Sequence, residues 1–305
     1  MVNPVATTTS VVTREVLASA LEADLKLDVV RTASRGHAAA LARQARSDGL
    51  DLVVVLGGDG TVNEVVNGLL AEGPHPSVPA LAVVPGGGTN VFARALGLPR
   101  DPVEATGAVL AAVRAGRSRD IGLGQAGERW FTFNAGMGWD AEVVARVDRV
   151  RRERGADRPP AVGAYVRAAV AQFFLSTDRR HPALTLERPG AEPVPGIHLA
   201  IVANTAPWTY LGERPLLTSP EAGFDTGLDV YALTGLRTLP TLAEVRRVMT
   251  GRVSRRARQV RREHDLAALT LRADRPVAAQ VDGEALGEVT ELSLRSVPRA
   301  LRVLA

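Results

Sequence analysis

The first third of the chain alternates short apolar runs with longer segments whose apolar residues recur every three or four positions. Short runs of this kind predict buried strands, and the periodic segments predict helices. Their alternation indicates βα units on a mostly parallel sheet. In chain order we expect a helix over residues 14–25, a strand over 27–31, a helix over 37–46, a strand over 51–56, a helix over 63–70, a strand over 80–84 and a helix over 90–96.

The pattern changes after a helix that ends near Ala115 and Gly116. Strand-like segments separated by turn residues follow, with few helices between them, which indicates a second, β-rich domain. We predict an α/β lobe over residues 1–121 and a β-rich lobe over 122–291, with a last strand over about 292–305 as a candidate to return to the first lobe. The predicted strands of the second lobe include 130–133, 184–186, 197–202, 228–233 and 269–273.

Composition fits a globular protein of two domains and excludes several classes of site. The chain has 305 residues, 46% of them hydrophobic, and no cysteine, so disulfides and cysteine nucleophiles are excluded. Its five histidines show no spacing typical of a zinc site. Arginine dominates the positive charge because Lys26 is the only lysine, which reflects either a GC-rich genome or a surface that binds phosphate. Aromatic residues make up only 4% of the chain, which argues against the stacking platforms of single-strand binders. A DNA-binding role would explain the arginines but not the glycine-rich segments described below, so we expect no nucleic-acid partner.

The chain shows no segment that predicts export or membrane insertion. Its start lacks the basic and apolar regions of a signal peptide. The longest apolar helix candidate, residues 161–175, is interrupted by Arg167 and is too short to span a bilayer. We expect this segment to be core, with one side as a candidate wall of an acyl pocket. The expected location is cytoplasmic, peripheral to the inner face of the membrane.

Two predicted strands end in glycine-rich segments that lead into predicted helices, at VLGGDGTVNE (55–64) and VVPGGGTN (83–90). Glycine lets the backbone approach a ligand closely, and helix N-termini direct N–H groups at anions. Two such junctions at the carboxyl ends of strands predict a phosphate site. Neither is a Walker loop, because no Lys-Ser/Thr pair follows the glycines.

Asp59 places a carboxylate inside the first of these phosphate-binding segments. A carboxylate there would repel phosphate unless a divalent cation lay between them, so Asp59 predicts Mg²⁺. The alternative is a turn-forming aspartate with no ligand.

Two further glycine motifs read as turns. Residues 122–127 match the dinucleotide pattern GxGxxG, but an alternating strand follows instead of a helix, so we interpret them as a hairpin turn. Residues 279–284 (AQVDGE) end a strand with Asp282 and Gly283, which is also a strong hairpin signal.

The chain resembles the diacylglycerol kinase catalytic family, meaning the bacterial soluble lipid kinases and their sphingosine-kinase relatives. The resemblance covers nearly the whole chain in the family's order. It rests on GGDGTVNE at 57–64, NGL at 67–69, PGGGTN at 85–90, LGLP at 96–99, DIG at 120–122, NAGMGWD at 134–140 and VDGE at 281–284.

The resemblance implies a phosphofructokinase-like α/β lobe and a β-sandwich lobe, with the active site between them, using ATP and Mg²⁺ to phosphorylate a lipid. Glu284 would be the general base, which replaces the plain hairpin interpretation. Asp59 would serve the catalytic Mg²⁺ through ATP, and Asp120 would help to organise metal and base. The implied nucleotide contacts are Asn3, Thr32, Gly57, Gly58, Asp59, Gly60, Thr61, Val62, Asn63, Glu64, Gly88, Thr89 and Asn90.

Two departures from the family pattern leave alternatives open. Only Met1 and Val2 precede Asn3, and residues 5–9 (VATTT) replace the family's loop glycine. Either hydroxyls do the phosphate-loop work, or this sequence begins downstream of the protein's own start. The family's structural Mg²⁺ site has an aspartate directly before Gly-Leu, whereas Thr226 stands there and Asp225 is shifted by one. A structural site on Asp225 and Leu228 is therefore in doubt.

The arginine-rich stretches 146–158 and 252–262 are either solvated helix faces or contacts with an anionic membrane.

The leading hypothesis is an ATP- and Mg²⁺-dependent lipid kinase that converts diacylglycerol to phosphatidate. The alternatives are a sphingoid-base or other lipid kinase, a related kinase of NAD, and a non-catalytic nucleotide or lipid sensor. The acceptor lipid and the oligomeric state are open; a homodimer is one candidate because many relatives pair.

Overall fold

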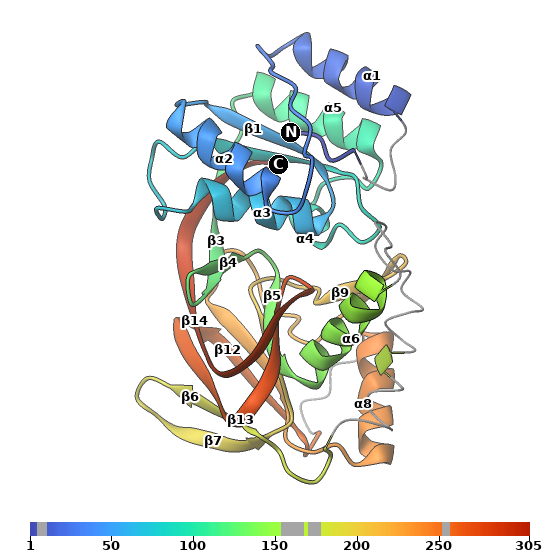
Figure 1. The fold of residues 1–305 in the computed structure, drawn as a ribbon, viewed down its shortest axis with the longest axis vertical. Helices are drawn as coiled ribbons and strands as arrows, with labels where there is room; N and C mark the ends of the chain where they lie inside the picture. Colours follow the sequence, from blue (N-terminus) through green and yellow to red (C-terminus); the bar gives the residue numbers. More distant parts are fainter. Residues whose placement is uncertain (5–10, 154–167, 170–177, 252–256) are drawn as a thin grey trace. The chain divides into compact units, whose positions relative to one another are not determined.

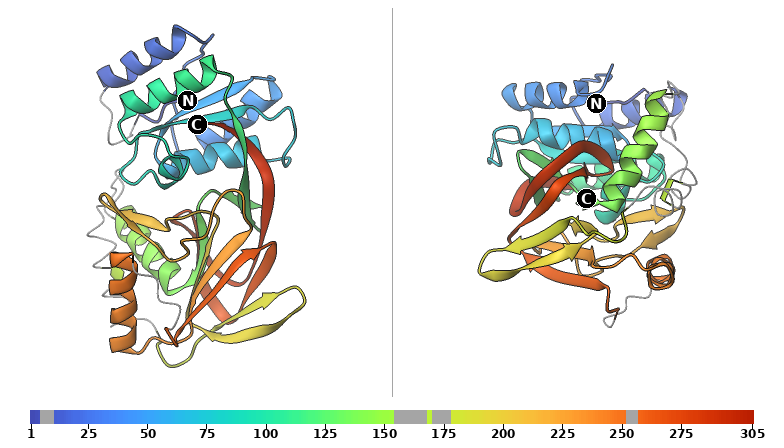
Figure 2. Two further views of the ribbon diagram at one scale, coloured as in Figure 1. Left: turned by 180° about the vertical axis from the view of Figure 1, so that it is seen from behind. Right: turned by 60° about the horizontal axis from the view of Figure 1, so that its bottom comes forward.

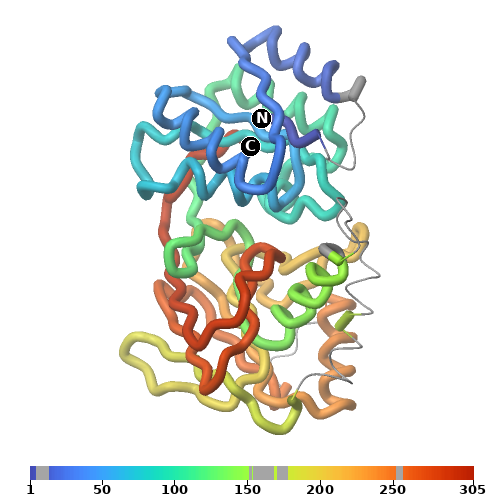
Figure 3. Tube along the Cα trace, viewed as in Figure 1, coloured from blue at the N-terminus to red at the C-terminus, as the bar shows by residue number. Residues whose placement is uncertain are grey.

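The computed structural model describes residues 1–4, 11–153, 168–169, 178–251 and 257–305. It divides into two compact units (Figure 1). The first unit contains Met1–Gly122 and Arg299–Ala305, and the second contains Leu123–Pro298. Both chain termini lie in the first unit (Figure 3). Residues 161–175, the candidate acyl-pocket helix, fall almost entirely outside the described ranges.

The first unit is a parallel sheet covered by helices on both faces. β1 (Leu52–Gly57) pairs in parallel with β2 (Ala80–Pro85), and the last residues of β14 (Glu284–Leu304) pair in parallel with β2. α1 (Val11–Glu22) and α5 (Pro102–Arg114) lie on one face of this sheet, and α2 (His37–Ser47) and α3 (Asp59–Leu69) on the other (Figures 1 and 2). α4 (Val91–Ala95) follows β2. Both faces of β2 are buried, which explains its continuous apolar run.

Two predicted elements of the first unit differ from the structure. The predicted strand over 27–31 is wrong: Arg31 makes an isolated bridge to Val2, which also bridges to Leu56. One bridging residue cannot form a ladder, so Val29 and Val30 stay exposed. The helix predicted from residue 63 begins at Asp59. Gly60 is a poor helix former, yet packing of the helix face against the sheet outweighs its propensity.

The second unit is dominated by antiparallel strands. β14 is followed across the sheet by β13 (Ala268–Val281), β5 (Asn134–Gly138), β8 (Leu199–Ala203), β11 (Leu228–Leu233) and β12 (Val260–Leu266). β3 (Arg119–Ala126) pairs with β14 and with β4 (Arg129–Phe131), while β6 (Leu184–Arg188) pairs with β13 and with β7 (Ala191–Ile197). β9 (Thr209–Leu211) and β10 (Arg214–Leu216) form a separate hairpin. The predicted fold class, an α/β lobe followed by a β-rich lobe, is confirmed; the residue ranges assigned to a nucleotide lobe and a lipid lobe stay predictions.

Helices in the second unit lie beside the sheet rather than between its strands. They include α6 (Trp139–Glu153) and α8 (Thr238–Thr250). The main core cluster contains buried residues of β5, β6, β8, β11 and β13, among them Met137, Leu186 and Val202. None of the helices in the described ranges is long and apolar enough to cross a bilayer.

Two strand predictions in the second unit need correction. Residues 197–202 form two strands, because β7 ends at Ile197 and β8 begins at Leu199. The GxGxxG segment is mostly strand: β3 runs to Ala126, and only Gly127, with a φ of 58°, and Glu128 form the turn to β4. A two-residue hairpin turn that begins with glycine needs a positive φ only at that glycine, which is Gly127, and the glycines before it lie in the ladder instead.

Candidate active site

The two glycine-rich junctions leave the sheet of the first unit side by side. β1 and β2 pair in register from Leu52 and Ala80 to Gly57 and Pro85, so both strands end at the same edge. The N–H of Gly86 donates to the carbonyl of Gly57 at 2.9 Å. Ligands of open α/β sheets bind at this edge, beyond the carboxyl ends of the strands.

Gly58 and Gly87 bring the two loops into backbone contact. A Cβ built on Gly87 would lie 2.7 Å from the Cα of Gly58, and one built on Gly58 would lie 3.2 Å from the Cα of Gly87. Neither position tolerates a side chain without moving the other loop. The glycines of the two sequence motifs therefore serve first to let the loops touch.

Asp59 and Asn90 fix the geometry of this contact. Asn90 adopts a left-handed conformation (φ 49°), accepts from the N–H of Gly87 at 2.9 Å and donates to the carbonyl of Gly87 at 2.6 Å. Oδ1 of Asp59 accepts from the N–H of Phe92 at 3.1 Å, at the start of α4. The carboxylate of the first junction thus caps the helix of the second, which is more than the turn-forming role considered from sequence.

The N-terminus of α3 opens at this edge. Its N-cap is Gly58 in an extended conformation, and glycine has no side chain with which to cap the helix. The first turn of a helix leaves N–H groups without intrahelical partners and carries the positive end of the helix dipole. Such an end, next to a glycine-lined loop, is suited to bind a phosphate.

The other residues implied as nucleotide contacts lie in different surroundings. Nδ2 of Asn3 donates to Oγ1 of Thr61 at 2.8 Å, and the N–H of Thr32 donates to the carbonyl of Val2 at 3.0 Å. Val62 and Asn63 are buried within the unit. Glu64 accepts from two N–H groups at the start of α2, those of Gly36 and Ala38. Direct nucleotide contact by these side chains stays a prediction.

The residues of the first glycine-rich junction are suited to a Mg²⁺ ion that binds together with a nucleotide. Within the described ranges, no group of three His, Asp or Glu side chains could hold a metal ion by itself. Asp59 is a single carboxylate beside a loop that a Cβ would fill and beside a helix N-terminus. Mg²⁺ prefers oxygen ligands, keeps several waters and is often held by one carboxylate plus substrate phosphates. These residues therefore fit Mg²⁺ as a partner of a bound nucleotide.

In the second unit, Asp282 fixes the hairpin that carries Glu284. Its buried carboxylate accepts from the N–H and Oγ1 of Thr132 at 2.7 and 2.8 Å, and from the N–H groups of Phe133 and Asn134 at 3.0 and 3.1 Å. Asp282 and Gly283 have φ angles of 48° and 75°, as in a type I′ turn between β13 and β14.

Gln280 joins this hairpin to the NAGMGWD segment. Its Nε2 donates to Oδ1 of Asn134 at 2.8 Å and to Oδ2 of Asp140 at 3.0 Å, and its Oε1 accepts from the N–H of Gly283 at 2.9 Å. A Cβ on Gly136 would lie 2.7 Å from the carbonyl oxygen of Ala200, so glycine lets β5 approach β8 closely at this point. Gln280 and Asp140 both fall within sequence motifs, but the sequence alone does not indicate their roles.

Glu284 is paired with an arginine that sequence analysis missed. Nη2 of Arg129 lies 2.6 Å from Oε2 of Glu284, and both side chains are partly buried. Because the two residues are 155 positions apart, no local pattern links them. Asp120, the third predicted catalytic residue, lies in β3 and pairs with Arg302 at 3.2 Å; its catalytic role stays a prediction.

Thr226 stands where the family's structural metal site has an aspartate, and it bonds to its own loop. Its Oγ1 donates to the carbonyl of Gly223 at 3.0 Å and accepts from the N–H of Gly223 at 3.2 Å. Asp225 is exposed, and Leu228 begins β11. The hydroxyl thus joins two ends of this loop, and a metal on Asp225 and Leu228 stays a prediction.

Asp140 predicts a pH-dependent stability. Burial raises the pKa of its carboxyl from 3.8 to about 6, although the hydrogen bond from Gln280 acts in the opposite direction. The folded chain therefore binds more protons than the unfolded chain between these values, and the stability that this group contributes is lost as pH rises through them. Asp140→Asn cannot ionise and keeps an oxygen for Gln280. We expect it to raise the free energy of unfolding above pH 6 and to leave it unchanged below about pH 4.

The measurement is urea unfolding across this pH range, followed by tryptophan fluorescence. All three tryptophans (Trp130, Trp139 and Trp208) lie in the second unit, so the signal reports that unit. Asp148→Asn, on the same helix α6, is the matched control and should follow the wild type. An equal gain for Asp140→Asn at every pH would contradict the assignment.

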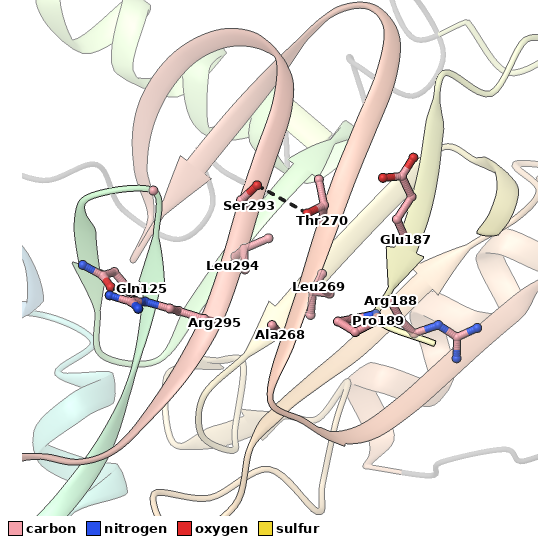
Figure 4. A pocket seen from close by; sticks show the side chains of 11 residues that line it. Gln125, Glu187, Arg188, Pro189, Ala268, Leu269, Thr270, Ser293, Leu294 and Arg295 are labelled. Atoms are coloured by element: carbon pink, nitrogen blue, oxygen red, sulfur yellow. Dashed lines mark hydrogen bonds between the residues drawn. The ribbon is translucent and has the colours of Figure 1, made fainter. Parts of the chain in front are cut away.

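A hollow of about 500 Å³ lies over the sheet of the second unit, among residues of β3, β6, β13 and β14 (Figure 4). Apolar and polar side chains line it, among them Leu269 and Leu294. Nε of Arg295 donates to Oε1 of Gln125 at 2.7 Å, and the hydroxyls of Thr270 and Ser293 lie 3.3 Å apart. None of the site residues predicted from sequence lines it.

Comparison with known sequences identifies similar proteins for the first part of the chain. Residues 1–126 match the family model described as the diacylglycerol kinase catalytic domain. A diacylglycerol kinase of Bacillus subtilis (strain 168) is 41% identical over 114 residues, which are 37% of this chain. The match spans only 35% of that relative's own length.

Solved structures resemble the whole chain in fold. The crystal structure of a diacylglycerol kinase from Bacillus anthracis strain Sterne has a TM-score of 0.72 at 19% identity, covering 99% of this chain and 94% of that one. An NAD kinase from Archaeoglobus fulgidus in complex with ATP has a TM-score of 0.52 at 11% identity, covering 100% of this chain and 92% of that one. At these identities the likeness establishes the two-lobe fold alone.

Proposed function

We propose that the chain is a lipid kinase that uses ATP and Mg²⁺, because residues 1–126 match the family model of the diacylglycerol kinase catalytic domain. It would transfer the γ-phosphoryl group to a lipid hydroxyl, with diacylglycerol as the leading acceptor and phosphatidate as the product. The observation that carries the proposal is the joined pair of glycine junctions, which Asp59 links through the N–H of Phe92.

The first unit would hold the nucleotide phosphates. The backbone N–H groups at the start of α3 and the N–H of Gly88 would be the donors for phosphate oxygens, because the N–H groups of Gly86 and Gly87 already hold the two junctions. Mg²⁺, when bound, would supply positive charge next to Asp59 that offsets the charge of the phosphates. Asp59 also keeps the two junctions together, so its carboxylate has both a structural and a chemical role.

Glu284 would accept the proton of the lipid hydroxyl. A carboxylate can take this proton as the oxygen attacks phosphorus, which is general base catalysis. The bonds of Asp282 hold the hairpin backbone, and Arg129 holds the carboxylate of Glu284. With its backbone and its carboxylate both held, Glu284 would be oriented before the lipid binds. This orientation would lower the entropic part of the activation barrier.

The acceptor and the setting of the enzyme are further proposals. Acyl pockets are apolar and discriminate little between lipid chains. A sphingoid base or a monoacylglycerol would therefore bind to the same residues as diacylglycerol. We place the protein at the inner face of an anionic membrane, as a peripheral enzyme of phospholipid biosynthesis. Pairing into a homodimer is part of the same proposal.

The test is transfer of ³²P from labelled ATP, with Mg²⁺, to a panel of acceptors that holds diacylglycerol, monoacylglycerol and sphingosine in mixed micelles, and NAD in solution. Asp59→Asn keeps an oxygen for the N–H of Phe92 but loses the negative charge. We expect it to lower turnover by about a hundredfold or more. Asp51→Asn, an exposed aspartate at the opposite end of β1, is the control and should label lipid like the wild type.

Each result of this test decides between functions. Labelled lipid from the wild type and Asp51→Asn, but not from Asp59→Asn, supports the kinase and names its acceptor. Label on NAD instead would assign the NAD kinase alternative. A wild type that binds ATP and labels nothing in the panel would favour a nucleotide sensor, and equal labelling by Asp59→Asn would remove that carboxylate from the mechanism.

A further inference from the structure

Helix α8 (Thr238–Thr250) buries polar side chains and exposes apolar ones. A surface helix normally turns its apolar stripe to the core and its polar residues to water. In α8 the buried residues are Thr241 and Glu244, whereas the exposed fractions of Leu239, Leu242 and Val245 are 79%, 51% and 38%. Leu239 is the most exposed large apolar residue in the described part of the chain.

The buried polar face is held by ion pairs. Arg262 and Arg247 each lie 3.1 Å from the carboxylate of Glu244, and the hydroxyl of Tyr231 donates to it at 3.3 Å. The guanidinium of Arg262 also lies 5.0 Å from the centre of the Tyr231 ring. Removing one partner of such a buried cluster would leave a charge without compensation. The helix is therefore anchored through Glu244, and its leucines are not needed to hold it in place.

The exposed apolar residues form one continuous stripe. With 3.6 residues per turn, Leu239, Leu242 and Val245 fall within a sector of about 120°, and the partly exposed Met249 falls inside it. α8 lies at the outer edge of the second unit (Figures 1 and 2). We define the α8 stripe as Leu239, Leu242, Val245 and Met249. An apolar cluster of this kind marks a surface that another body covers.

Charge indicates what covers the stripe. Arg237, at the N-cap, and Arg246, within the stripe sector, are exposed and have no ion-pair partner among the described residues. Glu244 is the only acidic residue of α8 and is buried, so the outward face carries positive charge alone. Arginines beside an apolar stripe can extend to lipid headgroups while the apolar side chains enter the interface.

A second copy of the chain fits this face less well. A two-fold interface places the same surface on both sides, so it would bring Arg246 and its neighbours against arginines of the other copy. An anionic bilayer offers opposite charge and an apolar layer together. We propose that the α8 stripe docks the protein on an anionic lipid bilayer. This inference rests on the proposed function, since a kinase of membrane lipids must reach its acceptor at such a surface.

The test is co-sedimentation of the full chain, without ATP, with two kinds of vesicle: phosphatidylcholine alone, and phosphatidylcholine mixed with phosphatidylglycerol. The triple variant Leu239→Asn, Leu242→Asn, Val245→Thr should lower binding to the mixed vesicles by about tenfold or more. Arg246→Glu should lower it by about thirtyfold, and much less on phosphatidylcholine alone.

Matched controls lie on the first unit. Val103→Asn, on α5, changes an apolar side chain that is 57% exposed, and Arg43→Glu, on α2, reverses an exposed arginine. Both should bind the mixed vesicles like the wild type. All variants change exposed side chains, so we expect their thermal unfolding to match that of the wild type. Measuring it confirms that each variant is folded.

Three outcomes would overturn the docking proposal: a wild type that does not sediment with mixed vesicles, a triple variant that sediments like the wild type, or a wild-type dimer in sedimentation velocity that the triple variant dissociates. The last would make the stripe an interface between copies. The experiments distinguish a failure of the docking proposal from a failure of the kinase proposal. Vesicle binding through α8 with no labelled lipid in micelles would end the kinase proposal alone, and labelled lipid with α8-independent binding would end the docking proposal alone.

Discussion

Glu284→Gln is expected to lower lipid phosphorylation by about a hundredfold to ten-thousandfold, the usual range for losing a general base. Glutamine has the size of glutamate and keeps an oxygen for Arg129, which lies 2.6 Å from Oε2 in the wild type. The hairpin should therefore keep its conformation, while the amide cannot accept the proton of the lipid hydroxyl. The measurement is single-turnover transfer of ³²P from ATP to the acceptor found with the wild type.

Nucleotide affinity separates this effect from a binding defect. The phosphate donors belong to the first unit, so Glu284→Gln should bind ATP like the wild type, whereas Asp59→Asn should also weaken it. Glu288→Gln makes the same chemical change four positions further along β14, at an exposed side chain, and should keep full transfer. If Glu284 serves only as the partner of Arg129, Glu284→Gln will keep wild-type transfer, and the base must be sought elsewhere.

The glycine junctions could be predicted from sequence because their signals are local. β2 is buried on both faces, and β1 is buried or half-buried along its length. Both strands are therefore continuous apolar runs, and glycines follow each run. The contact between Gly58 and Gly87 could not be predicted, because it depends on the register of β1 against β2. The start of α3 was placed four residues late for a related reason: packing on the sheet extends the helix through Gly60.

The second half of the candidate site depends on contacts between distant residues. Asp282 and Thr132 are 150 positions apart, and the pairing of β13 with β5 brings them together. Sequence alone reads residues 281–284 as a hairpin, which the structure confirms, but it cannot show that the aspartate is buried and bonded. The resemblance drew attention to Glu284 and gave no sign of Arg129.

Helix α8 shows a limit of periodicity itself. Its leucines recur at helical spacing, which by the ordinary rule would turn them to the core. The packed face is decided instead by Glu244, which meets Arg262 of β12, 18 positions away. A periodic pattern shows which residues share a face of a helix, but not which face packs against the rest of the protein. In α8 an ion pair buries the polar face and leaves the apolar residues exposed.

Asp282→Ala is expected to lower the free energy of unfolding of the second unit by about 4 kcal/mol. The substitution leaves three backbone N–H groups and one hydroxyl without their buried acceptor. It also places alanine at a φ of 48°, a conformation that costs about 1 kcal/mol for a residue with a Cβ and no polar side chain. Urea unfolding followed by tryptophan fluorescence measures the loss, since the tryptophans lie in this unit.

Asp282→Gly separates the two contributions to this loss. Glycine accepts the positive φ, so this variant keeps the turn and loses only the hydrogen bonds; we expect a loss of about 3 kcal/mol. Asp274→Ala is the matched control on the same strand β13: its side chain is 66% exposed and pairs with Arg275, so its loss should stay below about 0.5 kcal/mol. If Asp282→Gly is as stable as the wild type, the aspartate serves the turn conformation alone. Its buried bonds would then not be what holds Glu284 in place, and the fixed position of the proposed base would need another cause.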